Sequence, residues 1–464
     1  MDYELDAYIK GKPFVVDANL QKDEMHIKTL SIKYAPKFAD SNLQKVRSDP
    51  KYCTIKLAKE QEKAKSCPLY RKHGAKNFLL LDFQKSVDGK IIEATLSTGL
   101  LIQVDGKHDR YLFFGHTSTQ LRQKTCVLYN ESALKVSFEQ LISGFGIFDM
   151  KNVSKRAARI GLLLSSSKVA VQLRENQIKF IDDIEHHGFN FTDGCGFISE
   201  EIAKEVVEKL QIGDYFKHQV PPYPSVYQIR IQGCKGVLIL SKDRKWKDCI
   251  AIRKSMVKFK WNPNWKSRSF DLGIVSDGKG TSFPNRFGFL NRQYIRLLSG
   301  LGVKDEVFLK KQSDYFKDLS EIESNQEVQL RLLCAFEKYD LVDSLLRSSN
   351  GKTDEAIMAE LYQLQQKYCS PFKGKTLSEG LRIPLEKSRA VYGVADPSEK
   401  LMEGQCFFQP TIRGKPTVLD TNVVVGRSPT YYPGDIRVLK CVHDEQLLHL
   451  VDCIVFPVQG LYSN

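Results

Sequence analysis

The chain contains 464 residues, of which 42% are hydrophobic and 27% are charged, and this balance excludes a disordered chain as the default interpretation. At this length we expect more than one domain. The formal net charge of +14 indicates a polyanionic partner, either nucleic acid or an anionic membrane surface. No apolar run approaches the length of a membrane span, and the first residues lack the apolar core of a secretory signal. We therefore expect a soluble, intracellular protein that has no membrane partner.

The 11 cysteines are scattered along the chain, and none of them forms a Cys-x-x-Cys pair. An odd number of cysteines without a paired framework is typical of single buried thiols in a reducing compartment. The pattern therefore predicts neither disulfides nor a zinc site.

The first part of the chain divides into a polar lead-in over residues 1–75 and a β-rich region over residues 76–190. Residues 152–167 carry apolar side chains near one face and basic side chains around it, which predicts a basic helix. Such a face can bind phosphate, although it is more often simply solvated. Three apolar runs predict strands, the last two of them joined as a hairpin with a turn longer than two residues: 78–83, 100–104 and 111–114.

A second predicted hairpin carries a candidate contact for phosphate. Residues 227–231 alternate strictly and residues 237–240 are apolar, which places Lys235 near the tip. Lys235 lies between Gly233 and Gly236, where the exposed backbone suits a phosphate contact. A glycine-flanked lysine in a turn is more commonly just exposed to solvent, so the spacing alone gives little weight to a phosphate contact.

The most basic stretch, residues 242–268, contains ten lysines and arginines together with all three tryptophans, Trp246, Trp261 and Trp265. Lysine and arginine neutralise phosphates, and aromatic rings stack on unpaired bases. The stretch therefore has two interpretations. It is either a nucleic-acid surface or a solvated strand face whose tryptophans anchor loops in the core.

Helices and short strands follow in the second part of the chain. Ser199, with two glutamates after it, predicts a capped helix start. Residues 314–368 carry apolar side chains at helical spacing, which predicts either a connector between two β-rich bodies or a helical pair that binds a partner. Short apolar runs bounded by glycine and proline predict strands at 423–425, 436–439 and 453–458.

Taken in order, several segments resemble the eukaryotic cellular RNA-dependent RNA polymerases of RNA silencing. The resemblance extends from about Tyr70 to Gly460, and the shared order of the segments is more specific than any one of them. The segments are FFGHTSTQLR at 113–122, KNVSKRAARIG at 151–161, FTDGCG at 191–196, GCKG at 233–236, LNRQ at 290–293, GRSP at 426–429 and PGDIR at 433–437.

The resemblance implies an α+β fold with a double-psi β-barrel polymerase core behind a β-rich slab. The first barrel would occupy residues 191–268, a helical connector residues 269–404, and the first part of the second barrel residues 405–464. The family carries its metal-binding aspartates in a D-x-D-G-D element, which would follow Asn464. No catalytic residue or metal ligand is therefore expected in this chain, and Mg²⁺ is expected for the complete enzyme.

The resemblance also implies roles for individual basic residues. Lys235 matches the family's glycine-flanked lysine, and Arg253 and Lys258 match the basic positions of an R-P-S-M-x-K-F-like segment. These three residues would contact nucleotide or RNA phosphate. Arg427 and Arg437 match arginines beside the active site. Further candidates for the RNA channel are Lys254, Lys260, Trp261 and Trp265.

At two positions the chain departs from the family pattern. Lys254 stands where proline is usual, and Ser428 stands where asparagine is usual. The second departure changes the hydrogen bonding expected in the turn around Ser428.

Three functions remain open at this point. The first is an RNA-dependent RNA polymerase that makes complementary RNA on a single-stranded template from nucleoside triphosphates. This chain would be an incomplete part of that enzyme, and silencing-pathway proteins would be its partners. The second is a non-catalytic RNA-binding protein that retains the family's RNA channel. The third is a basic scaffold with no role in RNA binding.

Overall fold

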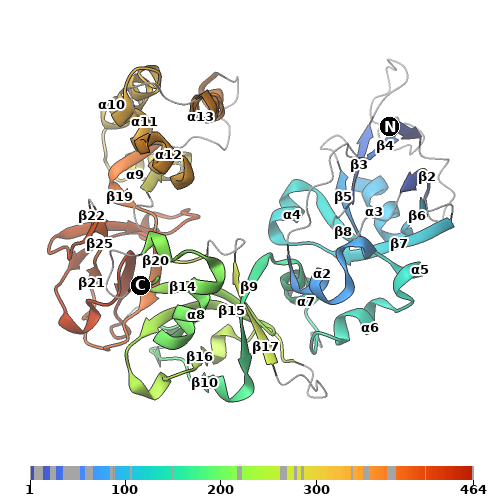
Figure 1. Ribbon diagram of the computed structural model, residues 1–464, viewed down its shortest axis with the longest axis horizontal. Coiled ribbons are helices and arrows are strands. Elements are labelled where there is room, and N and C mark those ends of the chain that lie inside the picture. The colour runs from blue at the N-terminus through green and yellow to red at the C-terminus, as the bar shows by residue number, and fades with distance from the viewer. Residues whose placement is uncertain are drawn as a thin grey trace. The chain divides into compact units, whose positions relative to one another are not determined.

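The computed structural model describes residues 2–4, 14–20, 28–34, 53–57, 66–83, 87, 89–104, 107–148, 151–216, 222–261, 269–275, 280–283, 287–335, 338–347, 355–373, 383–412 and 414–461 (Figure 1). The chain divides into two compact units. The first unit consists of Met1–Phe180, Gln228–Gly236 and Lys254–Gly280, and the second consists of Ile181–Tyr227, Val237–Arg253 and Thr281–Asn464. None of the described helices is both long and apolar enough to span a bilayer.

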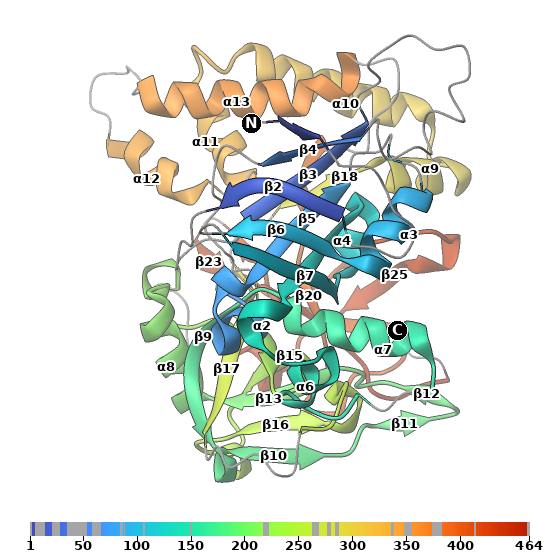
Figure 2. The same ribbon diagram turned by 90° about the vertical axis from the view of Figure 1, so that its right-hand side faces the viewer.

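The first unit contains an eight-stranded sheet in the order β1-β4-β3-β5-β8-β7-β6-β2, and Figure 2 shows several of its strands side by side. Four of the strands come from the segment expected to be a polar lead-in. The β6–β7 hairpin pairs Val104 with Lys107, so its connection is two residues long and shorter than expected. The strands are β1 (Asp2–Glu4), β2 (Phe14–Leu20), β3 (Lys28–Tyr34), β4 (Cys53–Leu57), β5 (Phe78–Phe83), β6 (Leu100–Val104), β7 (Lys107–Gly115) and β8 (Thr125–Asn130).

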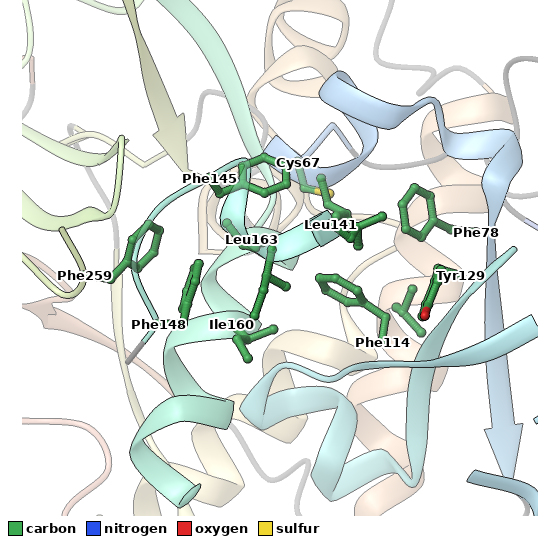
Figure 3. Packing of buried hydrophobic residues seen from close by; sticks show 13 residues of the cluster. Cys67, Phe78, Phe114, Tyr129, Leu141, Phe145, Phe148, Ile160, Leu163 and Phe259 are labelled. Atoms are coloured by element: carbon green, nitrogen blue, oxygen red, sulfur yellow. The ribbon is translucent and has the colours of Figure 1, made fainter. Parts of the chain in front are cut away.

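Short helices accompany this sheet and bury an aromatic cluster against it (Figure 3). The expected basic helix is α7, which is capped by Asn152, buries Ile160 and continues into a 3₁₀ turn. Phe148 and Phe259 lie at one end of the cluster, with ring centroids 4.5 Å apart. The helices are α2 (Pro68–His73), α3 (Gly89–Thr98), α4 (Ser118–Gln123), α5 (Glu131–Leu134), α6 (Phe138–Ser143) and α7 (Val153–Ile160).

Strands from the middle of the chain contribute to both units. In the first unit β17 pairs antiparallel with β9 and with β14. In the second unit β13 pairs parallel with β15 and antiparallel with β16. Ser199 caps α8 (Glu200–Leu210) as expected, because its hydroxyl accepts from the Ile202 amide. The strands are β9 (Ser167–Arg174), β10 (Ile178–Ile181), β11 (Glu185–His186), β12 (Phe189–Asn190), β13 (Cys195–Ser199), β14 (Val226–Ile231), β15 (Cys234–Ser241), β16 (Ile250–Arg253) and β17 (Ser269–Val275).

The second unit also contains a helical region with its own apolar core, which Figure 1 shows in gold and orange. Its β18 (Phe287–Leu290) and β19 (Ile383–Arg389) pair antiparallel on either side of the helices in sequence. The segment from 269 to 404 is therefore helical in its middle and begins and ends with strands. The helices are α9 (Arg292–Gly300), α10 (Asp305–Ser320), α11 (Gln326–Ala335), α12 (Tyr339–Arg347) and α13 (Glu355–Lys373).

The C-terminal part of the chain forms a five-stranded sheet in the order β20-β26-β21-β25-β24. It is mixed, because β26 runs parallel to β20 and antiparallel to β21. The three C-terminal strands expected from the sequence are present in it as β24, β25 and β26. Its strands are β20 (Tyr392–Ala395), β21 (Gln405–Phe408), β24 (Asn422–Gly426), β25 (Ile436–Cys441) and β26 (Cys453–Phe456), and a separate pair is formed by β22 (Thr411–Ile412) and β23 (Lys415–Pro416).

Buried hydrogen bonds join the segment between β25 and β26 to β15 and to Ser225, the residue before β14, within the second unit. The Ser225 hydroxyl accepts from the Val451 amide at 2.7 Å and donates to the His449 carbonyl at 3.3 Å. His449 Nε2 lies 3.2 Å from the Leu240 carbonyl. Burial and the nearby Lys242 lower the pKa of His449, so the ring is neutral near pH 7 and donates to Leu240 from Nε2.

Phe259 in the first unit is held between two glycine backbones. A Cβ on Gly233 would lie 2.5 Å from the Phe259 carbonyl oxygen and 2.8 Å from its ring, and a Cβ on Gly146 would lie 2.7 Å from the same ring. Hydrogen bonds flank the contact, from the Lys258 amide to the Gly233 carbonyl at 2.9 Å and from the Ile147 amide to the Lys260 carbonyl at 2.8 Å. The absence of side chains at both glycines therefore fixes the course of residues 258–260.

We predict that Gly233→Ala destabilises the fold more than Gly188→Ala. Both glycines have φ +80°, but a Cβ on Gly188 would meet nothing within 4 Å. Both variants carry the backbone strain of a left-handed alanine, and only Gly233→Ala adds the clash with Phe259. The added loss in the free energy of unfolding should be about 1–3 kcal/mol, as for an overpacked core. Denaturant unfolding of the two variants measures this difference, and equal losses would refute the packing role of Gly233.

Candidate nucleic-acid interface

The β14–β15 hairpin positions Lys235 immediately after a tight turn. Gln232 and Gly233, both with positive φ, form the two-residue connection. This is the backbone twist that joins antiparallel strands most readily. Lys235 is the second residue of β15 and is exposed, so it lies beside the turn instead of at its tip.

Lys258 reaches the same hairpin from a distant part of the sequence. The chain leaves β16 through a 3₁₀ turn at Lys254–Met256, and Val257 then forms a β-bridge with Cys234. The Lys258 ammonium donates to the Ser255 carbonyl at 2.5 Å, and the backbone amide of Lys258 donates to the Gly233 carbonyl. The two lysines expected to contact phosphate, Lys235 and Lys258, are thus brought to one place in the first unit.

Two arginines complete a group of four cations, Arg159, Arg230, Lys235 and Lys258, which we call the cationic cluster. The pKa of Lys235 is lowered by partial burial and then by the positive charges of Arg230, Lys258 and Arg159. Like charges held this close disfavour one another's charged forms, and an anion between them would relieve the repulsion. The cluster is therefore suited to binding phosphate.

The arginines of the cationic cluster are held by their own elements. Arg230 on β14 donates from Nε to the Ser165 hydroxyl at 3.1 Å and from Nη1 to the Ile229 carbonyl at 2.7 Å. Arg159 belongs to the last turn of α7, and its buried Nε has no hydrogen-bond partner among the described residues. A buried donor without a partner is costly, so a ligand oxygen at this position would be stabilising.

Sequence reasoning did not select Arg159 or Arg230. Arg159 lies in one of the family-like segments and on the basic helix, so a signal was present for it. Arg230 lies in an alternating strand, and nothing in that pattern separates it from a solvated strand residue. Only the pairing of β14 and the position of α7 bring the two arginines near Lys235.

Arg253 is placed differently from the lysines. Its side chain is buried, donates from Nε to the Cys195 carbonyl at 2.7 Å and from Nη1 to the Asp182 carbonyl at 2.5 Å, and lies 5.5 Å from the Phe197 ring centre. Burial lowers its pKa, against the opposing effects of Cys195, Asp183 and Glu399. These contacts favour packing of β16 as the role of Arg253, and its contact with phosphate stays a prediction.

The expected RNA-channel residues have different surroundings. Lys254 and Lys260 have exposed side chains. Trp261 is half-buried and packs between Phe180 and Phe270, with ring centroids 5.5 Å from each, so its ring is used in packing. Trp265 lies outside the described residues.

Arg427 and Arg437 lie on the β24–β25 hairpin of the second unit. Arg427 Nε is 3.2 Å from the Asp435 carboxylate. The backbone amides of Tyr431 and Tyr432, and then Arg427, lower the pKa of Asp435. Arg437 is exposed and pairs with Val425 across the hairpin. The cationic cluster belongs to the first unit, and this hairpin belongs to the second.

Within the described parts of the chain, no group of three or more histidine, cysteine, aspartate or glutamate side chains is arranged to hold a metal ion. Asp435 forms an ion pair with Arg427, and its oxygens already accept from two amides and this arginine. The described residues therefore do not fit a catalytic Mg²⁺, which takes carboxylate ligands. No chemical step through a metal is assigned to them.

Comparison with known proteins identifies the family. Residues 53–463 match the family model described as RNA dependent RNA polymerase. The probable RNA-dependent RNA polymerase SHL2 of Oryza sativa subsp. japonica is 33% identical over 372 residues, covering 76% of this chain and 29% of the relative. RNA-dependent RNA polymerase 6 of Arabidopsis thaliana is 32% identical over 398 residues, covering 81% of this chain and 31% of the relative. The chain thus spans about a third of the length of these relatives.

The fold is also found among solved structures. RNA dependent RNA polymerase QDE-1 from Thielavia terrestris matches with a TM-score of 0.65 and 18% identity, over 95% of this chain and 52% of that chain. This match confirms the expected α+β fold with its double-psi β-barrel core. Since the family model covers most of the sequence, the chain belongs to the RNA-dependent RNA polymerase family, as the resemblance of its segments predicted.

Proposed function

We propose that this chain is part of an RNA-directed RNA polymerase, a nucleotidyltransferase that copies single-stranded RNA from nucleoside triphosphates in RNA silencing. The observation that carries the proposal is the cationic cluster, because three further cations near enough to affect Lys235 suit phosphate groups of RNA or nucleotide. Membership of the polymerase family supports the reaction type. An intracellular location and partners from the silencing pathway stay predictions.

In this proposal the chain's own residues bind and orient phosphates. Lys235 supplies an exposed ammonium group, Lys258 supplies an ammonium group held by the Ser255 carbonyl, and Arg159 supplies a buried N–H that has no partner among the described residues. Positive charge fixed before the substrate arrives stabilises the negative charge that develops during phosphoryl transfer. Mg²⁺ would supply the activation of the attacking and leaving oxygens, through carboxylates that are not among the residues described.

The alternative is a non-catalytic RNA-binding protein that retains the family's RNA channel, in which the cationic cluster would bind RNA phosphates without a chemical step. The messenger RNA beyond the codon for Asn464 separates the two functions. A coding sequence for D-x-D-G-D supports the polymerase, and a stop codon followed by a stable folded product supports the alternative.

We predict that removing cluster charges shallows the salt dependence of RNA binding. Each lost phosphate contact should reduce the slope of log affinity against log salt by about 0.7 for single-stranded RNA. Lys235→Ala and Lys258→Ala should each show this reduction in fluorescence anisotropy titrations. Lys209→Ala, on the exposed side of α8, is the matched control and should leave the slope unchanged. Unchanged slopes for both cluster variants would count against the site, and no RNA binding at low salt would support the scaffold reading.

We also predict that RNA affinity falls as the pH rises through the pKa of Lys235. That pKa lies below the ordinary lysine value, so this ammonium loses its proton at lower pH than a surface lysine does. Phosphate binds the charged form, so deprotonation weakens binding. Lys235→Arg keeps its charge and should hold its affinity over the same range. Titration with oligoadenylate, whose bases do not ionise there, tests this, and parallel curves for the two proteins would contradict it.

A further inference from the structure

Two adjacent tyrosines are exposed on the loop that joins β24 to β25. Tyr431 is 64% exposed and Tyr432 is 71% exposed, whereas Phe407 and Tyr227 in the same unit are fully buried. On β24 and β25, the two strands that this loop joins, Val424 and Val438 pair with one another across the hairpin and are each 67% exposed. Neighbouring exposed apolar side chains of this size mark an interaction surface more often than scattered single residues do.

The backbone beneath these rings is held in place. The Asp435 carboxylate accepts from the amides of Tyr431 and Tyr432 at 3.1 and 3.2 Å, and the Asp435 amide donates to the Tyr432 carbonyl at 3.0 Å. Where the loop leaves β24, a Cβ on Gly426 would lie 2.8 Å from the Tyr294 ring of α9. The rings are therefore presented from an ordered loop, and a partner would not have to order the backbone on binding.

The charge of the loop selects the kind of partner. Between residues 427 and 437 the charged side chains are Arg427, Asp435 and Arg437. Asp435 is 14% exposed, while Arg427 is 79% exposed and Arg437 is exposed as well. The acid thus lies inside the loop, where it pairs with Arg427, and both arginines have exposed side chains on the same hairpin as the tyrosines. Flat rings next to arginines suit a nucleic-acid strand, whose bases stack and whose phosphates need cations.

We propose that Tyr431 and Tyr432 form a stacking platform for unpaired bases of single-stranded RNA, with Arg427 and Arg437 against the adjoining phosphates. The inference rests on the proposed RNA-binding function and adds a second contact, made by base stacking in the second unit. Stacking is tolerant of sequence because every base has a flat face.

The experiment uses the 464-residue chain and a labelled single-stranded RNA of about 12 nucleotides, within the range of strand-binding sites. Tyr431→Ala/Tyr432→Ala should weaken binding by about fivefold or more, in line with stacking on one or two bases. Tyr431→Phe/Tyr432→Phe keeps both rings and should bind within about twofold of the parent chain, since stacking needs the ring and not the hydroxyl. Leu309→Ala removes exposed apolar surface from α10 of the same unit, outside the hairpin, and should leave binding unchanged. Photocrosslinking with 5-iodouridine in the RNA should label Tyr431 or Tyr432.

The outcomes separate this inference from the proposed function. Loss of affinity with an unchanged salt slope in the alanine pair, together with the crosslink, supports the platform. If Lys235→Ala alters the slope while the tyrosine variants bind normally, the platform is wrong and RNA binding by the cationic cluster stands. If the parent chain binds no RNA, both proposals fail. If the alanine pair instead converts a dimer to a monomer in sedimentation, the surface binds a second copy and the RNA platform is overturned.

Discussion

The contact of Phe259 with the backbones of Gly146 and Gly233 is the constraint on which the candidate site depends. It fixes residues 258–260 against the β14–β15 turn and so places Lys258 beside Lys235. Burying a phenylalanine contributes about 1.5–3 kcal/mol. That gain opposes the repulsion between neighbouring cations, which adds to the larger effect of partial burial in lowering the pKa of Lys235. Apolar packing thus holds together a cluster of cations that would otherwise repel one another.

How far the sequence predicted this arrangement depends on the range of the interactions. Local signals were sufficient for the helix capped by Ser199 and for the β14–β15 hairpin, because capping and alternation act within a few residues. The family resemblance gave the double-psi β-barrel fold. Arg159 and Arg230 were missed because their closeness to Lys235 arises from pairing and packing between distant segments. No local pattern carries that information.

Two other segments show that composition alone does not determine the surroundings of a residue. The predicted lead-in over residues 1–75 is polar and rich in lysine, yet it supplies four strands, because β5 and β6 offer edges with which β3 and β2 can pair. Arg253 belongs to a strongly basic stretch, yet all four residues of β16 are buried and its guanidinium bonds backbone carbonyls. A basic residue in such a stretch can therefore either form hydrogen bonds in the protein interior or bind a ligand.

The bonds between Ser225, His449, Leu240 and Val451 differ in kind from the packing around Phe259. Each exchanges bonds with water for bonds within the protein and contributes only about 0.5–1.5 kcal/mol. Their directions, however, are narrow, since a hydrogen bond weakens steeply when it bends. These hydrogen bonds therefore add little to the stability of the packing between β14, β15 and the C-terminal sheet. They act on alignment instead, because they select one orientation of the strands among the many that apolar packing alone would allow.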